Sequence, residues 1–107
     1  MAAPAQSSVR NRLLATLLPT DFRLLETQLE PVPLPLRTRL IEPNTPIEHV
    51  CFLEQGIASN IAVLPHGRRV EVAVIGREGL SGTPVLLGTD RTPHECFIQV
   101  PGTGLRI

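Results

Sequence analysis

Residues 49–75 read HVCFLEQGIASNIAVLPHGRRVEVAVI and decide the fold class. Within them, residues 70–75 alternate between valine and other residues, which predicts a strand with its valines on one face. Residues 49–53 and 57–64 predict two more strands, parted by residues 54–56, and the turn-forming residues 65–68 connect to the valine strand. Several short strands joined by marked turns predict a mainly β protein, either a barrel or a two-sheet roll.

The flanking sequence adds two helices before these strands and further strands around them. Residues 11–18 predict a helix that Pro19 ends, and Thr20 is a plausible N-cap for the next helix. That second helix places Phe22, Leu25 and Leu29 on one apolar face. Residues 32–36 alternate with prolines and predict an edge strand, since proline cannot donate to a ladder. Short strands are also expected at residues 40–42, 96–100 and 105–107.

Composition limits the chain to one small domain. Its 107 residues are 42% hydrophobic, so we expect a loose tail over residues 1–9, rich in Ala, Pro and Ser, and a folded unit over residues 10–107. The formal net charge is +0, which argues against nonspecific attraction to nucleic acid or to an anionic membrane. The apolar run 13–18 is too short for a signal sequence or a membrane span. We therefore expect a cytoplasmic protein without a membrane partner.

The reactive residue types do not form a catalytic or metal-binding pattern. Cys51 and Cys96 stand far apart, so we expect two buried, reduced thiols and neither a disulfide nor a metal site. The three histidines share no metal-ligand spacing, and Glu71 and Glu78 are single carboxylates without a visible partner for acid–base work. The sequence predicts no catalytic residue, no metal and no enzyme.

Four motifs together resemble the N-terminal domain of Crp/Fnr transcription regulators. They are EQGIAS at 54–59, HGRR at 66–69, VIGREG at 74–79 and GTPVLLG at 82–88. Each motif is weak alone, but their order and spacing make the set fairly specific, and the resemblance covers residues 10–107. It implies a double-stranded β-helix, or jelly roll, with two short N-terminal helices, which senses a small-molecule effector.

The same resemblance implies parts that are not found in these residues. In the family, a dimerisation helix and a helix-turn-helix domain follow the roll, and neither follows Ile107. We therefore expect a fragment that does not contact DNA itself, whereas a full-length relative would bind DNA as a homodimer.

The resemblance also places the effector pocket. Family members that bind cyclic nucleotides carry a Gly-Glu-aliphatic-small-Leu run and then Arg-x-Ala, which together hold the ribose and the phosphate. Gly82 matches the glycine, Thr83 stands in place of the glutamate, Pro84 removes an amide donor, and Val85 takes the small position. These departures weaken the contacts that a cyclic nucleotide needs.

The arginine of the pocket is ambiguous. With a one-residue deletion, Arg91 and Thr92 align with the phosphate-binding segment, whereas alignment from the final strand leaves no arginine there. A solvated loop position for Arg91 is the simpler alternative. The candidate effector-pocket residues are Gly82, Thr83, Pro84, Val85, Arg91 and Thr92, and we expect no cofactor and no cyclic nucleotide.

Two functions from different classes follow. The first is a non-catalytic, effector-sensing domain of a Crp/Fnr-type regulator whose cyclic-nucleotide pocket is degenerate. The second is a truncated or effector-independent roll that acts only as an interaction or structural module. A cupin-like metal enzyme on a similar roll would need clustered histidines, and His49, His66 and His94 are scattered.

Overall fold

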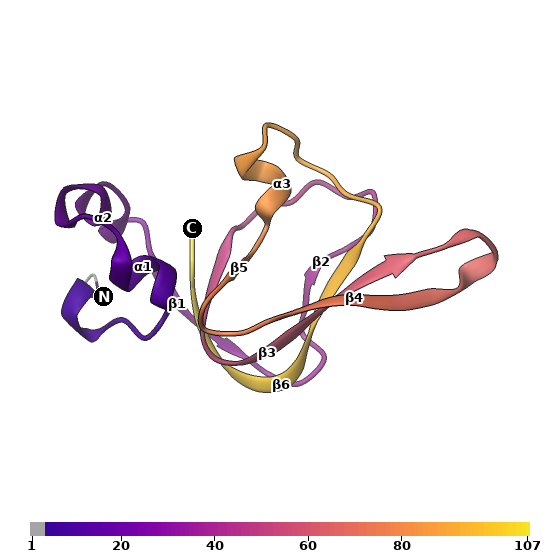
Figure 1. The fold of residues 1–107 in the computed structure, drawn as a ribbon, viewed down its shortest axis with the longest axis horizontal. Coiled ribbons are helices and arrows are strands. Elements are labelled where there is room, and N and C mark those ends of the chain that lie inside the picture. The colour runs from indigo at the N-terminus through magenta and orange to yellow at the C-terminus, as the bar shows by residue number, and fades with distance from the viewer. Residues whose placement is uncertain (1–3) are drawn as a thin grey trace.

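Strands β3 (Cys51–Val63) and β6 (Glu95–Arg106) organise the fold, because each remaining strand pairs with one of them and they pair with each other. The computed structural model describes residues 4–107. All pairings are antiparallel, in the order β1-β6-β3-β4, with β2 on β6 and β5 on β3 (Figure 1). The other elements are η1 (Gln6–Ser8), α1 (Arg12–Thr16), α2 (Pro19–Glu26), β1 (Glu30–Leu34), β2 (Arg39–Ile41), η2 (Pro65–Gly67), β4 (Arg69–Ile75), β5 (Leu80–Ser81) and α3 (Thr83–Leu86).

The two long strands replace four predicted short ones. The predicted break at residues 54–56 was wrong, because β3 passes through it with bulges that keep it paired to β6. The predicted strands 96–100 and 105–107 are likewise one strand. Gly56 and Gly102 make this possible where the two strands meet: a β carbon on Gly102 would overlap the backbone of Gln55, and one on Gly56 would overlap the carbonyl of Val100. The glycines let the strands bend without separating.

The valine strand is present as β4, but the prediction that its valines share one face was wrong. The register between β3 and β4 shifts by one residue and leaves Val72 as an extra residue in the ladder. Val70 consequently lies opposite Ala62 and Val74 opposite Ser59, which belong to opposite faces of β3. The β3–β4 hairpin projects from the body, with η2 at its tip (Figure 1).

Two short helices precede the roll, as predicted, with different boundaries. The Asn11 side chain caps α1 by accepting a hydrogen bond from the Leu14 amide at 3.2 Å. Pro19 does not end α1 but begins α2, a position where its missing N–H is not needed. The prediction of Thr20 as the N-cap was therefore wrong, since Leu18 holds that position without a side-chain cap.

The proline-rich strand is at the edge of the sheet, as predicted. β1 pairs only with β6, and Pro33 lies opposite Thr103. The strand begins at Glu30 and ends at Leu34, so its bounds differ from the predicted 32–36. The mainly β roll with two short N-terminal helices is confirmed.

Two clusters of buried side chains hold the fold together. The roll core fills the space inside the strands, and the helical-end core lies between the helices and the nearby end of the roll. The roll core consists of Leu34, Ile41, Cys51, Leu53, Ala58, Cys96 and Ile98, and the helical-end core of Leu14, Phe22, Leu29, Val50, Phe52 and Leu105.

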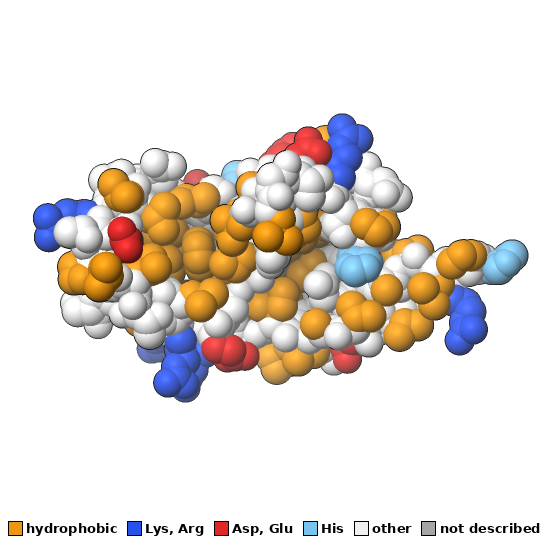
Figure 2. Space-filling view, turned by 45° about the horizontal axis from the view of Figure 1, so that its top comes forward, with side chains coloured by type: hydrophobic (Ala, Val, Ile, Leu, Met, Phe, Trp, Pro, Cys, Tyr) orange, Lys and Arg blue, Asp and Glu red, His pale blue; other side chains and the backbone are white. Residues whose placement is uncertain are grey.

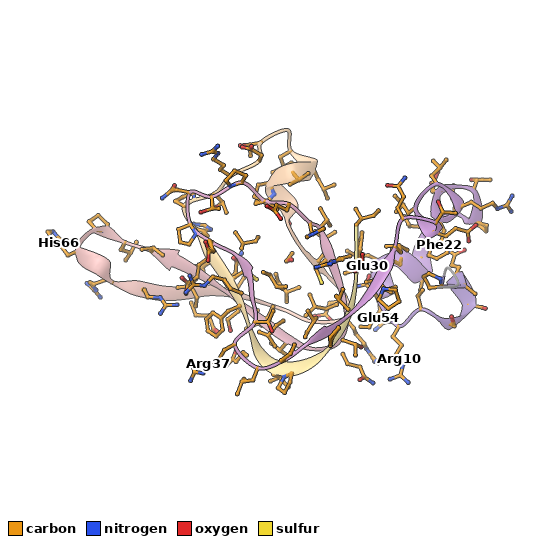
Figure 3. All side chains as sticks on the ribbon, turned by 180° about the vertical axis from the view of Figure 1, so that it is seen from behind. Arg10, Phe22, Glu30, Arg37, Glu54 and His66 are labelled. Atoms are coloured by element: carbon orange, nitrogen blue, oxygen red, sulfur yellow. The ribbon has the colours of Figure 1, made fainter. Side chains whose placement is uncertain are left out.

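A polar joint attaches the helices to the roll. The fully buried side chain of Asn11 donates hydrogen bonds to the carbonyl oxygens of Leu53 and Gly79, both at 2.7 Å. The Glu54 carboxylate accepts from the backbone amides of Arg10 and Asn11, and Figure 3 shows Arg10 and Glu54 side by side. Buried polar groups that are all paired fix one docking geometry.

The predicted tail, residues 1–9, is in part packed. Residues 1–3 lie outside the described residues. η1 follows, and the Gln6 side chain donates hydrogen bonds to the carbonyl oxygens of Leu14 at 3.1 Å and Leu17 at 2.8 Å.

Candidate functional site

The segment that follows β5 forms one wall of the candidate site. β5 pairs with β3, with Ser81 opposite Cys51, and the chain then turns at Gly82, whose φ is +100°. A β carbon at Gly82 would lie 3.2 Å from the carbonyl oxygen of His49. Both the left-handed backbone and this close approach favour glycine. The turn leads directly into α3.

A cavity of about 300 Å³ lies between this segment and strands β2, β3, β4 and β6. The described residues around it carry apolar or uncharged polar side chains, together with one histidine. Figure 2 shows hydrophobic side chains spread across this side of the molecule, with acidic and basic side chains mostly toward its rim. The polar lining consists of Asn60, Ser81, Thr83, Thr92 and His94, and the remaining lining of Ile41, Ile75, Leu80, Gly82, Pro84, Leu87 and Cys96.

The structure brings together four of the six predicted pocket residues: Gly82, Thr83, Pro84 and Thr92 all line this cavity. The other two do not line it. Val85 is exposed on α3. Arg91 has a side chain that is 56% exposed and pairs with Asp90, with 3.5 Å between Nε and Oδ1.

Solved structures share this architecture. The chain is similar to the N-terminal domain of a transcriptional regulator from Streptomyces coelicolor A3(2), at 21% identity and TM-score 0.74, over 92% of this chain and 68% of that one. It is similar to a cyclic nucleotide-binding domain from Methylobacillus flagellatus KT, at 14% identity and TM-score 0.73, over 85% and 51%. This chain has the cyclic nucleotide-binding fold.

A third similar structure is the sensor domain of the transcriptional regulator DNR from Pseudomonas aeruginosa, at 17% identity and TM-score 0.72, over 88% of this chain and 63% of that one. The chain thus spans about half to two thirds of these three structures. No protein-family model and no curated protein matches the sequence.

Within this cyclic nucleotide-binding fold, several backbone amides toward the C-terminal end of the α3 segment donate hydrogen bonds within that segment. The Val85 amide donates a hydrogen bond to the Gly82 carbonyl oxygen at 3.0 Å. The amides of Leu87 and Thr89 both donate to the Pro84 carbonyl oxygen, each at 3.0 Å. Pro84 has no N–H to offer. A phosphate in the cavity would meet no guanidinium from the described residues that line it, and a buried anion without a charged partner is costly.

The Cys96 thiol lines the cavity and stays protonated near neutral pH. Burial raises the pKa of Cys96 to about 12, and the neighbouring Cys51 adds to the rise. Burial likewise raises the pKa of Cys51 to about 11, and the charge of Arg106 opposes this shift. Both thiols are free and stay protonated near neutral pH, so they act as small apolar groups.

The sequence interpretation missed Asn60 and considered His94 only as a metal ligand. Asn60 is the one amide side chain in the apolar run 57–64, and that was the only signal available for it. Its position inward on β3, opposite Cys96 on β6, depends on a register that the sequence alone does not show.

The histidines lie in different places. His66 is at the tip of the β3–β4 hairpin (Figure 3), whereas His94 lines the cavity. Within residues 4–107 no three His, Cys, Asp or Glu side chains lie close enough together to hold a metal ion. No helix in this part of the chain has the length and hydrophobicity to cross a membrane.

Proposed function

We propose that this chain is the effector-sensing domain of a Crp/Fnr-type transcription regulator and has no catalytic activity. The fold is the one found in the sensor domain of DNR and in the N-terminal domain of the Streptomyces regulator. The cavity beneath α3 is the observation that carries the proposal, because it joins Gly82, Thr83, Pro84 and Thr92 around a space large enough for a small ligand.

The effector is an uncharged molecule rather than a cyclic nucleotide. Thr83 is too short to take the place of a ribose-binding glutamate, and Arg91 pairs with Asp90 outside the cavity. Asn60 and His94 offer hydrogen bonds to a neutral polar group, while Ile75, Leu80 and Leu87 contact its apolar part. An uncharged ligand suits this cavity because no Asp, Glu, Lys or Arg among the described residues lines it.

Sensing requires that the ligand favours one of two arrangements of the roll. α3 is only four residues long and has exposed apolar side chains, so its position can shift at modest cost. A ligand that contacts α3 from one side and β3 from the other favours the arrangement in which both are in reach. In a full-length regulator of this family, this shift would pass to a dimer helix and a DNA-binding domain.

The second candidate function is an interaction module that needs no effector. Leu86 and Leu87 are 65% and 79% exposed, and in this second function another polypeptide covers this apolar surface beside the cavity. Such a module would bind its partner equally well with the cavity empty or filled.

A thermal-shift titration of the purified chain tests the proposal. The probes are cyclic AMP, cyclic GMP, and the matched pair benzamide and benzoate, which differ in charge but hardly in shape. We expect benzamide alone to raise the melting temperature, because only it avoids burying a charge. Thr92→Phe, which fills the cavity, should abolish the effect, and Arg91→Ala, outside the cavity, should leave it unchanged.

The other outcomes are also informative. A saturable stabilisation by cyclic AMP that Arg91→Ala abolishes would overturn the neutral-effector proposal and place Arg91 on the phosphate. Stabilisation by no probe would favour the interaction module.

A further inference from the structure

Four polar or charged residues are buried among residues 4–107, and only one of them has a side chain without a partner. The four are Asn11, Ser59, Ser81 and Glu95. Asn11 and Ser59 are hydrogen-bonded through their side chains, and Glu95 forms ion pairs with two arginines. Ser81 is 3% exposed, yet its hydroxyl makes no hydrogen bond within this part of the chain. A buried polar group without a partner calls for a specific explanation.

Ser81 lies at the buried end of the cavity beneath α3. It is opposite Cys51 in the register of β5 and β3, so the two side chains share a face of the sheet, and Cys51 belongs to the roll core. Ser81 is the buried member of the polar cavity lining, whose other residues are half-buried or exposed. It also borders a smaller cavity of about 140 Å³ toward β1 and β2, so it lies well inside the roll.

The Ser81 hydroxyl is not sealed off by its neighbours. Among residues 4–107, the one fully enclosed side-chain nitrogen or oxygen that lacks a partner is the Nε of Arg106. The Oγ of Ser81 also lacks a partner, and it therefore keeps contact with the space inside the roll. A ligand that enters the cavity can reach it.

The chemistry of a free hydroxyl favours a ligand that accepts a hydrogen bond. The Ser81 proton has no acceptor among the described residues, and a ligand carbonyl oxygen can accept it without bringing in a proton of its own. A ligand amine or hydroxyl at this position would add protons that also need acceptors. No carboxylate among the described residues lines the cavity to take them.

We propose that Ser81 determines the specificity of the cavity beneath α3 by donating a hydrogen bond to a carbonyl oxygen at the buried end of the ligand. This inference rests on the proposed function, since it takes this cavity to be the effector site. It narrows the effector to small uncharged carbonyl compounds. A ligand of the same shape without the carbonyl would leave the hydroxyl unpaired, and buried polar groups left unpaired reject such analogues.

Acetophenone and α-methylstyrene test the proposal, because they have nearly the same shape and differ in C=O against C=CH₂. The readout is the dissociation constant of each ligand from an ¹H–¹⁵N NMR titration of the whole chain. Ser81→Ala should weaken acetophenone binding about 10-fold and change α-methylstyrene binding less than about 2-fold. Each ligand is compared with itself across variants, so the different hydration of the two ligands cancels. Ser59→Ala, a buried serine outside the cavity lining, should change neither.

The two buried serines also give a readout without any ligand. The Oγ of Ser59 lies 2.7 Å from a carboxylate oxygen of Glu71 and 2.5 Å from the amide oxygen of Gln99, so Ser59→Ala should lower the melting temperature. Ser81→Ala removes a hydroxyl that has no protein partner, and should leave the melting temperature unchanged or raise it. Equal decreases would show that the Ser81 hydroxyl has a partner within the protein and would overturn the proposal.

Failure of this proposal and failure of the proposed function give different results. Ser81 does not select a carbonyl if Ser81→Ala weakens both ligands alike or neither, or if neither ligand binds, while benzamide still stabilises the chain. The cavity then keeps its proposed function. If benzamide also fails to bind, both proposals are overturned.

Discussion

At the helical end of the roll, buried apolar side chains from the helices and from β3 and β6 pack into one core, whereas at the hairpin end the valines of β4 stand in water. Phe22 is 2% exposed and Val72 is 53% exposed. The sequence at both ends is similarly apolar, so apolar pattern alone does not decide burial. What differs is that the helical end has a second layer to pack against, and the projecting hairpin has none.

Of the changes predicted here, loss of the Phe22 side chain from the helical-end core should have the largest effect on stability. Phe22→Ala should lower the free energy of unfolding by about 3–5 kcal/mol, because a large buried side chain is lost and a cavity is left. Leu24→Ala, on the exposed side of the same helix, should cost less than about 0.5 kcal/mol. Urea unfolding followed by circular dichroism measures both, and equal losses would show that the helices do not pack as described.

The polar joint at the same end should have the next largest effect. Asn11→Ala removes the α1 cap and the donors to Leu53 and Gly79, and we expect a loss of about 2–3 kcal/mol. Thr16→Ala removes an exposed hydrogen bond to Leu13 in the same helix and should change stability by less than about 0.5 kcal/mol. If both variants unfold at the same urea concentration, the joint does not hold the helices.

The two thiols give a pH test of the interior between the two ends. The chain has ten arginines but no lysine and no tyrosine. The two thiols are therefore its only side chains that titrate between pH 8 and 11. Their pKa values are about 11 and 12 in the folded chain against 9.0 as the reference, so the unfolded chain loses its thiol protons first as pH rises.

The thiol contribution to the free energy of unfolding should therefore be constant below pH 8 and fall above pH 9, by on the order of 2 kcal/mol at pH 10. The measurement is urea unfolding at a series of pH values under reducing conditions. The double variant Cys51→Ala with Cys96→Ala should remove the decline above pH 9. Persistence of that decline in the double variant would assign it to another cause.

The smallest effect belongs to the hairpin end. Val72→Thr should change the free energy of unfolding by less than about 0.5 kcal/mol, because the side chain is already in water. Val50→Thr is the same substitution in the helical-end core and should cost about 1–3 kcal/mol, since it buries a hydroxyl. Calorimetric melting of the pair would contradict the comparison if Val72→Thr proved the more damaging.

Local patterns in the sequence predicted the strands, the proline-rich edge and the turn at residues 65–68, because each depends on neighbouring residues. The predicted break at Gly56 was wrong because Gly56 does not end the strand. It allows the close approach of the strand segment around Gly102, which is distant in the sequence. The single face of valines was wrong because the bulge at Val72 comes from pairing with β3.

The same limit applies to the candidate site. Gly82, Thr83 and Pro84 are contiguous, so one motif was enough to predict them together, and the structure brings Thr92 to the same cavity. The position of Asn60 in the cavity is defined by the strand that lies opposite it, with Cys96 as its partner. No local pattern contains that information.

The central position of β6 also sets the order in which the chain can fold. β6 is the last strand in the sequence, yet β1, β2 and β3 all pair with it, from Glu95 opposite Ile61 to Arg106 opposite Cys51. During synthesis the ribosome must release residues 95–106 before the roll can close. Until then β3 has an open edge rich in apolar residues, so a nascent chain is exposed to aggregation, and closure over such distant pairings is slow.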